Sequence, residues 1–124
     1  MLPPSVSPRP GGLFMCLPIA LQSESNMREH WASRHHRRAR QRVTVRFFTA
    51  HFRHVTPPCD VTITRIAPKR LDDDNLVGSA KAVRDEIAAL LGVDDADESV
   101  TFRVMQTKGE PRTYGVWIDI KERK

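Results

Sequence analysis

The strongest pattern of hydrophobic positions lies between residues 76 and 92. Apolar side chains recur there at intervals of three and four residues, which is the spacing of one helix face. They are Leu76, Ala80, Val83, Ile87 and Leu90. Gly92 follows them, and glycine commonly ends a helix. The sequence therefore predicts one amphipathic helix that ends at Gly92.

Alternation of apolar and polar residues predicts strands on both sides of this helix. Residues 61–66, rich in valine, isoleucine and threonine, form one predicted strand. Residues 100–104 and 114–120 alternate and are separated by a Lys-Gly-Glu-Pro turn at 108–111, so we predict that they form a β-hairpin. A short strand is predicted over residues 16–21, where Pro18 favours the edge of a sheet.

Before residue 55 the apolar pattern permits two interpretations. Between Met27 and Phe52 apolar residues recur at spacings near three and four, which is compatible with a long helix that has one narrow apolar stripe. The β-branched and aromatic run from Val43 to Phe48 could instead be extended. Residues 1–14 contain four prolines and two glycines, and we predict a disordered N-terminal tail there.

The helical interpretation gives the order strand, helix, strand, helix, strand, strand. This order predicts an α/β (α+β) fold, in which a small mixed four-stranded sheet packs against two main helices. A chain of 124 residues has the usual size of one domain. We therefore expect a single domain over residues 15–124, preceded by the tail.

Charge changes this picture, because it is unevenly distributed. Lys and Arg total 20 against 15 Asp and Glu, a formal net charge of +5, which favours a polyanionic partner or a membrane surface. Residues 28–54 hold eight arginines and all five histidines but one acid. Cys16 and Cys59 lack the spacing of a disulfide framework or a zinc site, and no segment has the length of a membrane span. We expect a cytoplasmic protein without a membrane partner.

Two interpretations of the basic segment stay open, a solvated or membrane-surface helix face and a nucleic-acid-binding surface. Arginine outnumbers lysine there, and its planar set of donors suits bidentate contacts to phosphate. This preference favours nucleic acid. The residues expected to contact the DNA backbone are Arg34, Arg37, Arg38, Arg42, Lys69 and Arg70.

The segment from Asp72 to Asp97 is acidic, with one group of acids before the predicted helix and another after Gly92. A helix cap needs a single such residue, although plain solvated acids remain an alternative for both groups. Oxygen-only ligands of this kind suit Mg²⁺ or Mn²⁺. On the predicted helix, Asp74, Lys81 and Asp85 share the face opposite the apolar stripe.

Three stretches of this region resemble RusA-type Holliday junction resolvases, especially their short phage and prophage relatives. They are Arg70-Leu-Asp72-Asp-Asp74-Asn75-Leu76, Lys81-Ala-Val-Arg-Asp85 and Gly92-Val-Asp94-Asp95. The resemblance covers about residues 65–105, and it implies a RusA-like fold. It also implies a Mg²⁺-dependent endodeoxyribonuclease, with Mn²⁺ as a possible substitute, that resolves four-way junctions or other branched DNA in recombination and repair.

The resemblance further implies individual roles. Asp72, Asp74 and Asp95 would be catalytic metal ligands, and Lys81 a catalytic residue that steadies the scissile phosphate or the leaving group. Asn75, Asp85 and Asp94 would support them. Members of the family are homodimers that cut two opposing strands symmetrically, so a homodimer is implied here. The alternative is a non-catalytic basic DNA-binding protein of phage origin, in which the acids only cap and solubilise the helix.

Overall fold

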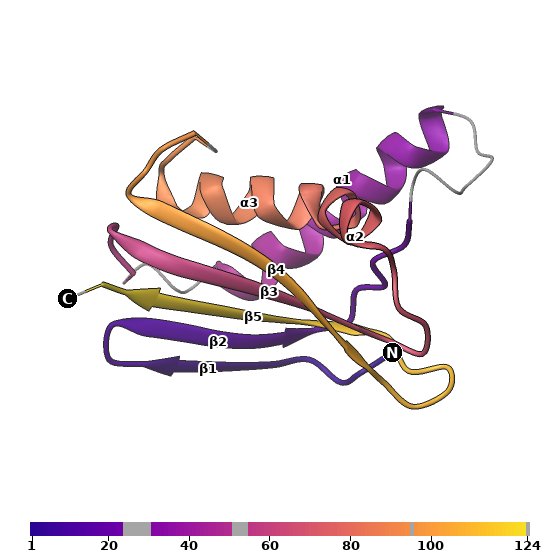
Figure 1. Cartoon of the computed structure of the whole chain (residues 1–124). Coiled ribbons are helices and arrows are strands. Elements are labelled where there is room, and N and C mark those ends of the chain that lie inside the picture. The colour runs from indigo at the N-terminus through magenta and orange to yellow at the C-terminus, as the bar shows by residue number, and fades with distance from the viewer. Residues whose placement is uncertain (24–30, 51–54, 95, 124) are drawn as a thin grey trace.

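A computed structural model of the chain describes residues 1–23, 31–50, 55–94 and 96–123. It has a mixed α+β fold with one five-stranded sheet and three helices (Figure 1). The elements are β1 (Ser5–Arg9), β2 (Gly12–Leu17), α1 (Trp31–Thr49), β3 (Cys59–Ala67), α2 (Asp73–Ser79), α3 (Lys81–Leu91), β4 (Val100–Lys108) and β5 (Gly115–Glu122). The predicted fold class is confirmed in general, but the sheet has one more strand and the chain one more helix than we expected.

The sheet has the strand order β1-β2-β5-β3-β4. β5 is antiparallel to both of its neighbours, β2 and β3, whereas β4 pairs in parallel with β3. The three helices lie on one side of the sheet, and within the described ranges the other side carries no helix (Figure 1). The domain therefore has two layers.

The core lies between these layers. Met15, Ile118 and Ile63 are neighbours across β2, β5 and β3, and all three are fully buried. Val83 and Ile87 of α3 are buried in the same cluster. Because alternate strand residues point to opposite faces, the residues between them on each strand form the uncovered face.

The N-terminal segment is a β-hairpin, so our prediction of a disordered tail over residues 1–14 was wrong. β1 pairs with β2, and Gly11 at the turn has a φ of 67°, which glycine adopts at little cost. Pro8 is tolerated because β1 is an edge strand. The strand that we expected over residues 16–21 begins earlier, at Gly12, and ends just before Pro18.

The predicted helix before Gly92 is two helices, and the break lies at Ala80. Gly78 weakens helical structure, and the Ser79 hydroxyl donates to the carbonyl of Leu76 at 2.7 Å. Gly-Ser pairs are frequent sites of helix kinks. The end of α3 agrees with the prediction, since Gly92 adopts the left-handed conformation, with φ 72°, and its N–H caps the helix.

The strands β4 and β5 do not form the predicted hairpin. β3 and β4 are joined through α2 and α3, and a helical crossover of this kind produces a parallel strand pair. β5 then pairs on the other side of β3, between β3 and β2. The alternating pattern identified both strands correctly, but it carries no information about which strands pair.

The basic segment is helical over Trp31–Thr49, so the extended alternative for residues 43–48 was wrong. Gln41, Val45 and Thr49 form its buried stripe. The Thr49 hydroxyl donates to the carbonyl of Val45 at 2.8 Å, which satisfies a buried polar group within the helix. The ends of the helix that we expected, residues 27–30 and 51–52, lie outside the described residues.

A substitution at Leu13 tests whether the N-terminal hairpin belongs to the folded domain. Leu13 is 2 % exposed, so Leu13→Ala should lower the free energy of unfolding by about 2–4 kcal/mol. Urea unfolding measures this change, and Ser7→Ala on the exposed edge strand is the control. A Leu13→Ala variant as stable as the wild type would show that this segment does not pack on the core.

Candidate functional site

A buried carboxylate joins α1 to α3 and so fixes the position of the basic helix. The Glu86 side chain is 8 % exposed, and its oxygens accept hydrogen bonds at 3.0 Å from Arg42 Nε and Arg46 Nη2. Burial opposes ionisation of this carboxyl, but the bonds from Arg46 and Arg42 outweigh it and lower the pKa of Glu86 below its ordinary value. Glu86 is therefore an ionised anchor at neutral pH.

A groove of about 580 Å³ runs between α1 and α3 beside this anchor. Its residues on α1 include His35, Arg38, Arg42 and Arg46, and α3 contributes Ala82 and Asp85. Four basic side chains and one acid therefore line the groove, and two of the four, Arg42 and Arg46, are bonded to Glu86. Arg38 and Arg42, two of the predicted DNA contacts, belong to this groove.

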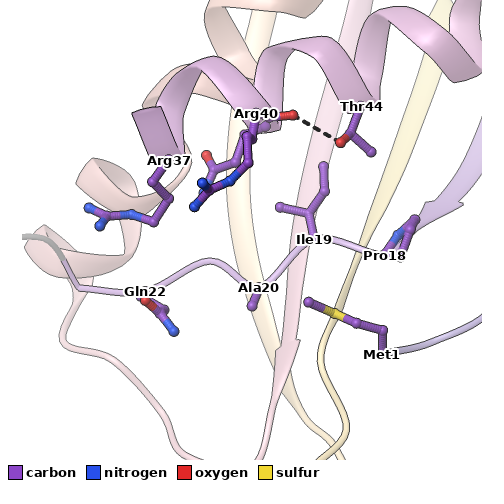
Figure 2. Close-up of a pocket in the computed structure, with 9 residues that line it drawn as sticks. Met1, Pro18, Ile19, Ala20, Gln22, Arg37, Arg40 and Thr44 are labelled. Carbon is purple, nitrogen blue, oxygen red and sulfur yellow. Dashed lines mark hydrogen bonds between the residues drawn. The ribbon is translucent and has the colours of Figure 1, made fainter. Parts of the chain in front are cut away.

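A second hollow, of about 370 Å³, lies on another side of α1. Figure 2 shows Arg37 and Arg40 projecting from the helix above the segment that contains Ile19 and Gln22. The Thr44 hydroxyl donates to the carbonyl of Arg40 at 2.9 Å within the same helix (Figure 2). The predicted arginines therefore lie on two sides of α1 and do not form one continuous face.

The other predicted DNA contacts differ in their surroundings. Arg34 is half-buried on α1, whereas Lys69 and Arg70 are exposed between β3 and α2. The carbonyl of Lys69 accepts a hydrogen bond at 2.6 Å from the buried Arg65 guanidinium. That bond holds the backbone of the loop in place, and the Lys69 side chain points into solvent.

The start of α2 presents three neighbouring carboxylates, Asp72, Asp73 and Asp74, all exposed. Asp72 is the N-cap residue, but its side chain makes no capping hydrogen bond. Asp73 and Asp74 lie in the first turn, where negative charge interacts favourably with the helix dipole. Within the described ranges, none of these three carboxylates has a hydrogen bond or an ion pair.

The break at Ala80 separates these acids from Lys81 and Asp85, so the single polar helix face that we predicted does not exist. Lys81 is the first residue of α3, and its Nζ lies 3.4 Å from Asp85 Oδ2. Such exposed pairs contribute little stability and exchange partners readily. Asn75 is half-buried on α2.

The second acidic group lies beyond the far end of α3, a helix of 11 residues that spans roughly 16 Å. Asp94 Oδ1 accepts a hydrogen bond from the N–H of Ala96 at 3.1 Å. Hydrogen bonds from Ser99 lower the pKa of Asp97. Asp95, the predicted third metal ligand, lies outside the described residues. In the part of the chain that the structure describes, no three His, Cys, Asp or Glu side chains are grouped to hold a metal ion.

Glu86 and Arg65 are buried charged residues that we did not predict from the sequence. Arg65 follows Val61 and Ile63 on the helix-covered face of β3, and its Nε donates to the carbonyl of Leu21 at 2.7 Å. Burial lowers the pKa of Arg65. Strand alternation predicts an inward position for this arginine, but the partners of both residues come from distant parts of the chain.

No protein-family model matches this chain, and no curated protein matches it. None of the described helices has the length and apolar character that crossing a membrane requires.

Proposed function

We propose that this chain is a metal-dependent endodeoxyribonuclease that binds branched DNA through α1 and cuts it at the start of α2. One observation carries the proposal: three adjacent carboxylates have no ion-pair partner among the described residues, in a protein with excess positive charge. Elsewhere, Glu86 and Asp119 are both paired with arginine. Unpaired acids beside a DNA-binding surface would repel phosphate, unless a cation joins the two.

The arginines of α1 would hold the DNA backbone. Arg37 and Arg40 at one hollow, and Arg38 at the groove, offer donors on two sides of one helix. Arginine donors suit phosphate oxygens, and backbone contacts position DNA without selecting its sequence. A helix with basic groups on two sides also suits a branched substrate, which presents more than one duplex arm.

Asp72 and Asp74 fit a hydrated Mg²⁺ ion, because they are exposed carboxylates with no other partner in the described part of the chain. Protein sites for this ion commonly supply one or two carboxylates, and substrate phosphate and water complete the shell. The resemblance proposes Asp95 as a third ligand, but its neighbour Asp94 lies beyond the far end of α3 from Asp72 and Asp74. When bound, Mg²⁺ or Mn²⁺ supplies charge neutralisation at the scissile phosphate.

Lys81 would hold the scissile phosphate or the leaving oxygen once DNA is bound. Its exposed ion pair with Asp85 can be exchanged for a phosphate contact at small cost. Asp85 would keep the lysine oriented until then. Asn75 and Asp94 remain proposed supporting residues.

We also propose that the active form is a homodimer. Val43 and Phe47, one turn apart on α1, are 57 % and 72 % exposed, and a second protomer on this side of the helix would bury both. Two protomers would provide two cutting sites, which symmetric cleavage of a four-way junction requires.

Cleavage of a synthetic four-way DNA junction by the purified protein tests the proposed activity. We expect paired nicks in opposing strands with Mg²⁺, none with EDTA, and slower cutting of a linear duplex of the same sequence. Binding of the junction without cutting in Mg²⁺ or Mn²⁺ would contradict the nuclease assignment. That result would favour the non-catalytic DNA-binding alternative, which the separation of Asp94 from the acids of α2 supports.

DNA binding by α1 predicts a specific salt dependence. Arg40→Ala should weaken junction binding several-fold at low salt, and it should reduce the log-log slope of affinity against salt by about 0.9, the value for one lost phosphate contact. Fluorescence anisotropy of a labelled junction measures both quantities. Lys108→Ala, at the end of β4, is the control. Equal slopes for wild type and Arg40→Ala would remove Arg40 from the interface.

A further inference from the structure

The uncovered face of the sheet carries an aromatic pair, in which Trp117 is exposed and Phe14 is half-buried. Phe14 on β2 and Trp117 on β5 have ring centroids 6.5 Å apart and planes tilted by 47°. Trp117 is 39 % exposed. Both residues alternate with core residues in their strands, so their rings lie on the side without helices. Flat rings at a protein surface are the groups on which unpaired nucleic-acid bases stack.

A polar hollow of about 260 Å³ lies next to this pair on the same face. Strand register connects the two features, because Phe14 is opposite Asp119, Asp119 is opposite Thr62, and Thr62 is opposite Arg103. The remaining lining residues include Asp60, Thr101 and Lys121. Aromatic and polar groups thus form one continuous surface across four strands.

In this hollow the acidic side chains have ion-pair partners, whereas two basic side chains have none among the described residues. Asp119 is held by Arg9 and Asp60 by Arg123, whose Nε lies 2.9 Å from the Asp60 carboxylate. Within the described chain, Arg103 and Lys121 have no ion pair or hydrogen bond from their side chains. The acids are neutralised and two cations stay available, so the hollow favours an anion.

We propose that this face binds single-stranded nucleic acid, with phosphates at Arg103 and Lys121 and bases stacked on Trp117 and Phe14. Strands lie about 4.8 Å apart, so the distance from Phe14 to Arg103 across three strand spacings accommodates more than one nucleotide. A duplex hides its base faces and cannot use the rings. The choice of DNA as the ligand rests on the proposed function, whereas the surface itself does not depend on cleavage.

Trp117 itself reports on this binding. The chain has two tryptophans and one tyrosine, and Trp31→Phe leaves Trp117 as the single tryptophan, which excitation at the red edge of the indole band observes without Tyr114. Titration of this variant with a short oligothymidine at low salt should quench its fluorescence, whereas a blunt duplex of equal length should leave it unchanged. Quenching by the duplex at equal affinity would overturn the single-strand assignment. A change with protein concentration alone would assign the face to self-association instead.

Charge removal completes the test. In the Trp31→Phe background, the double variant Arg103→Ala/Lys121→Ala should weaken oligothymidine binding roughly tenfold at low salt, and reduce the salt slope by about 0.7 for each lost phosphate contact. Lys108→Ala is the matched cation on β4 and should leave both unchanged. Both substituted residues are exposed, and equal thermal midpoints check the fold. Unchanged affinity in the double variant would overturn the proposal.

The two proposals fail separately. Trp117 quenching without junction cleavage would leave this surface in place and remove the nuclease. Junction cleavage without any change at Trp117, while anisotropy shows the oligonucleotide bound, would remove this surface alone.

Discussion

Asp74→Asn should abolish Mg²⁺-dependent cleavage of a four-way junction, with a loss of at least about a hundredfold, since even outer-shell partners of a metal typically contribute 10- to 100-fold. The amide keeps the size of the carboxylate but removes the charge that would hold the cation. DNA binding should stay the same or become tighter, because one negative charge facing phosphate is lost. Single-turnover cleavage and anisotropy with the same junction separate the two effects.

Asp73→Asn is the matched control for this experiment. Asp73 lies in the same first turn of α2, is also exposed, and has no proposed role as a ligand. We expect this variant to cut at nearly the wild-type rate. If Asp74→Asn also cuts at that rate, the metal site at the start of α2 is wrong; if both variants lose activity, the cleavage depends on the total charge of the segment.

Glu86→Ala should lower the free energy of unfolding by about 2–3 kcal/mol. Loss of one partner from a buried ion pair commonly costs 3–5 kcal/mol, and the cost is smaller here because the Arg42 and Arg46 side chains are 41 % and 64 % exposed and regain water. Urea unfolding measures the change. Asp85→Ala, the adjacent acid with an exposed ion pair, should change stability by less than about 1 kcal/mol.

The same carboxylate predicts a dependence on pH. Because the pKa of Glu86 is lowered in the folded state from its ordinary value of 4.5, its contribution is complete above that value and is lost as pH falls through the folded pKa. The stability difference between wild type and Glu86→Gln should therefore be constant near neutral pH and shrink below about pH 4. A difference that stays constant down to pH 3 would mean that Glu86 is not held ionised by the arginines.

Residue pattern was sufficient for most elements of the fold but not for their pairing. The periodicity that ends at Gly92 correctly placed the end of α3, because one residue type and a local hydrogen bond determine it. The pairing of β5 depends on contacts between distant segments. The alternation of apolar and polar residues within one strand does not indicate which strand lies beside it. We did not predict the hairpin that includes Pro8, because we took the prolines as a sign of disorder. Proline is excluded from central strands but is tolerated in an edge strand such as β1.

In the candidate site, too, local features could be predicted from the sequence and long-range contacts could not. Asp74 is exposed, which agrees with its predicted place opposite the apolar stripe. The break at Ala80, which places Lys81 on a different helix, follows from the local Gly78-Ser79 pair and could have been anticipated. The burial of Glu86 between two arginines could not have been anticipated, because its partners lie 40 or more residues away along the chain.

The central position of β5 sets the order of events during synthesis of the protein. β5 covers Gly115–Glu122 and joins β2 to β3 in the sheet. While the ribosome still holds these residues, the N-terminal hairpin has no strand to pair with on its inner side, and β3 exposes one edge. The sheet therefore closes after β5 leaves the exit tunnel, and a nascent chain that stalls before residue 115 presents two unpaired strand edges to chaperones or to other nascent chains.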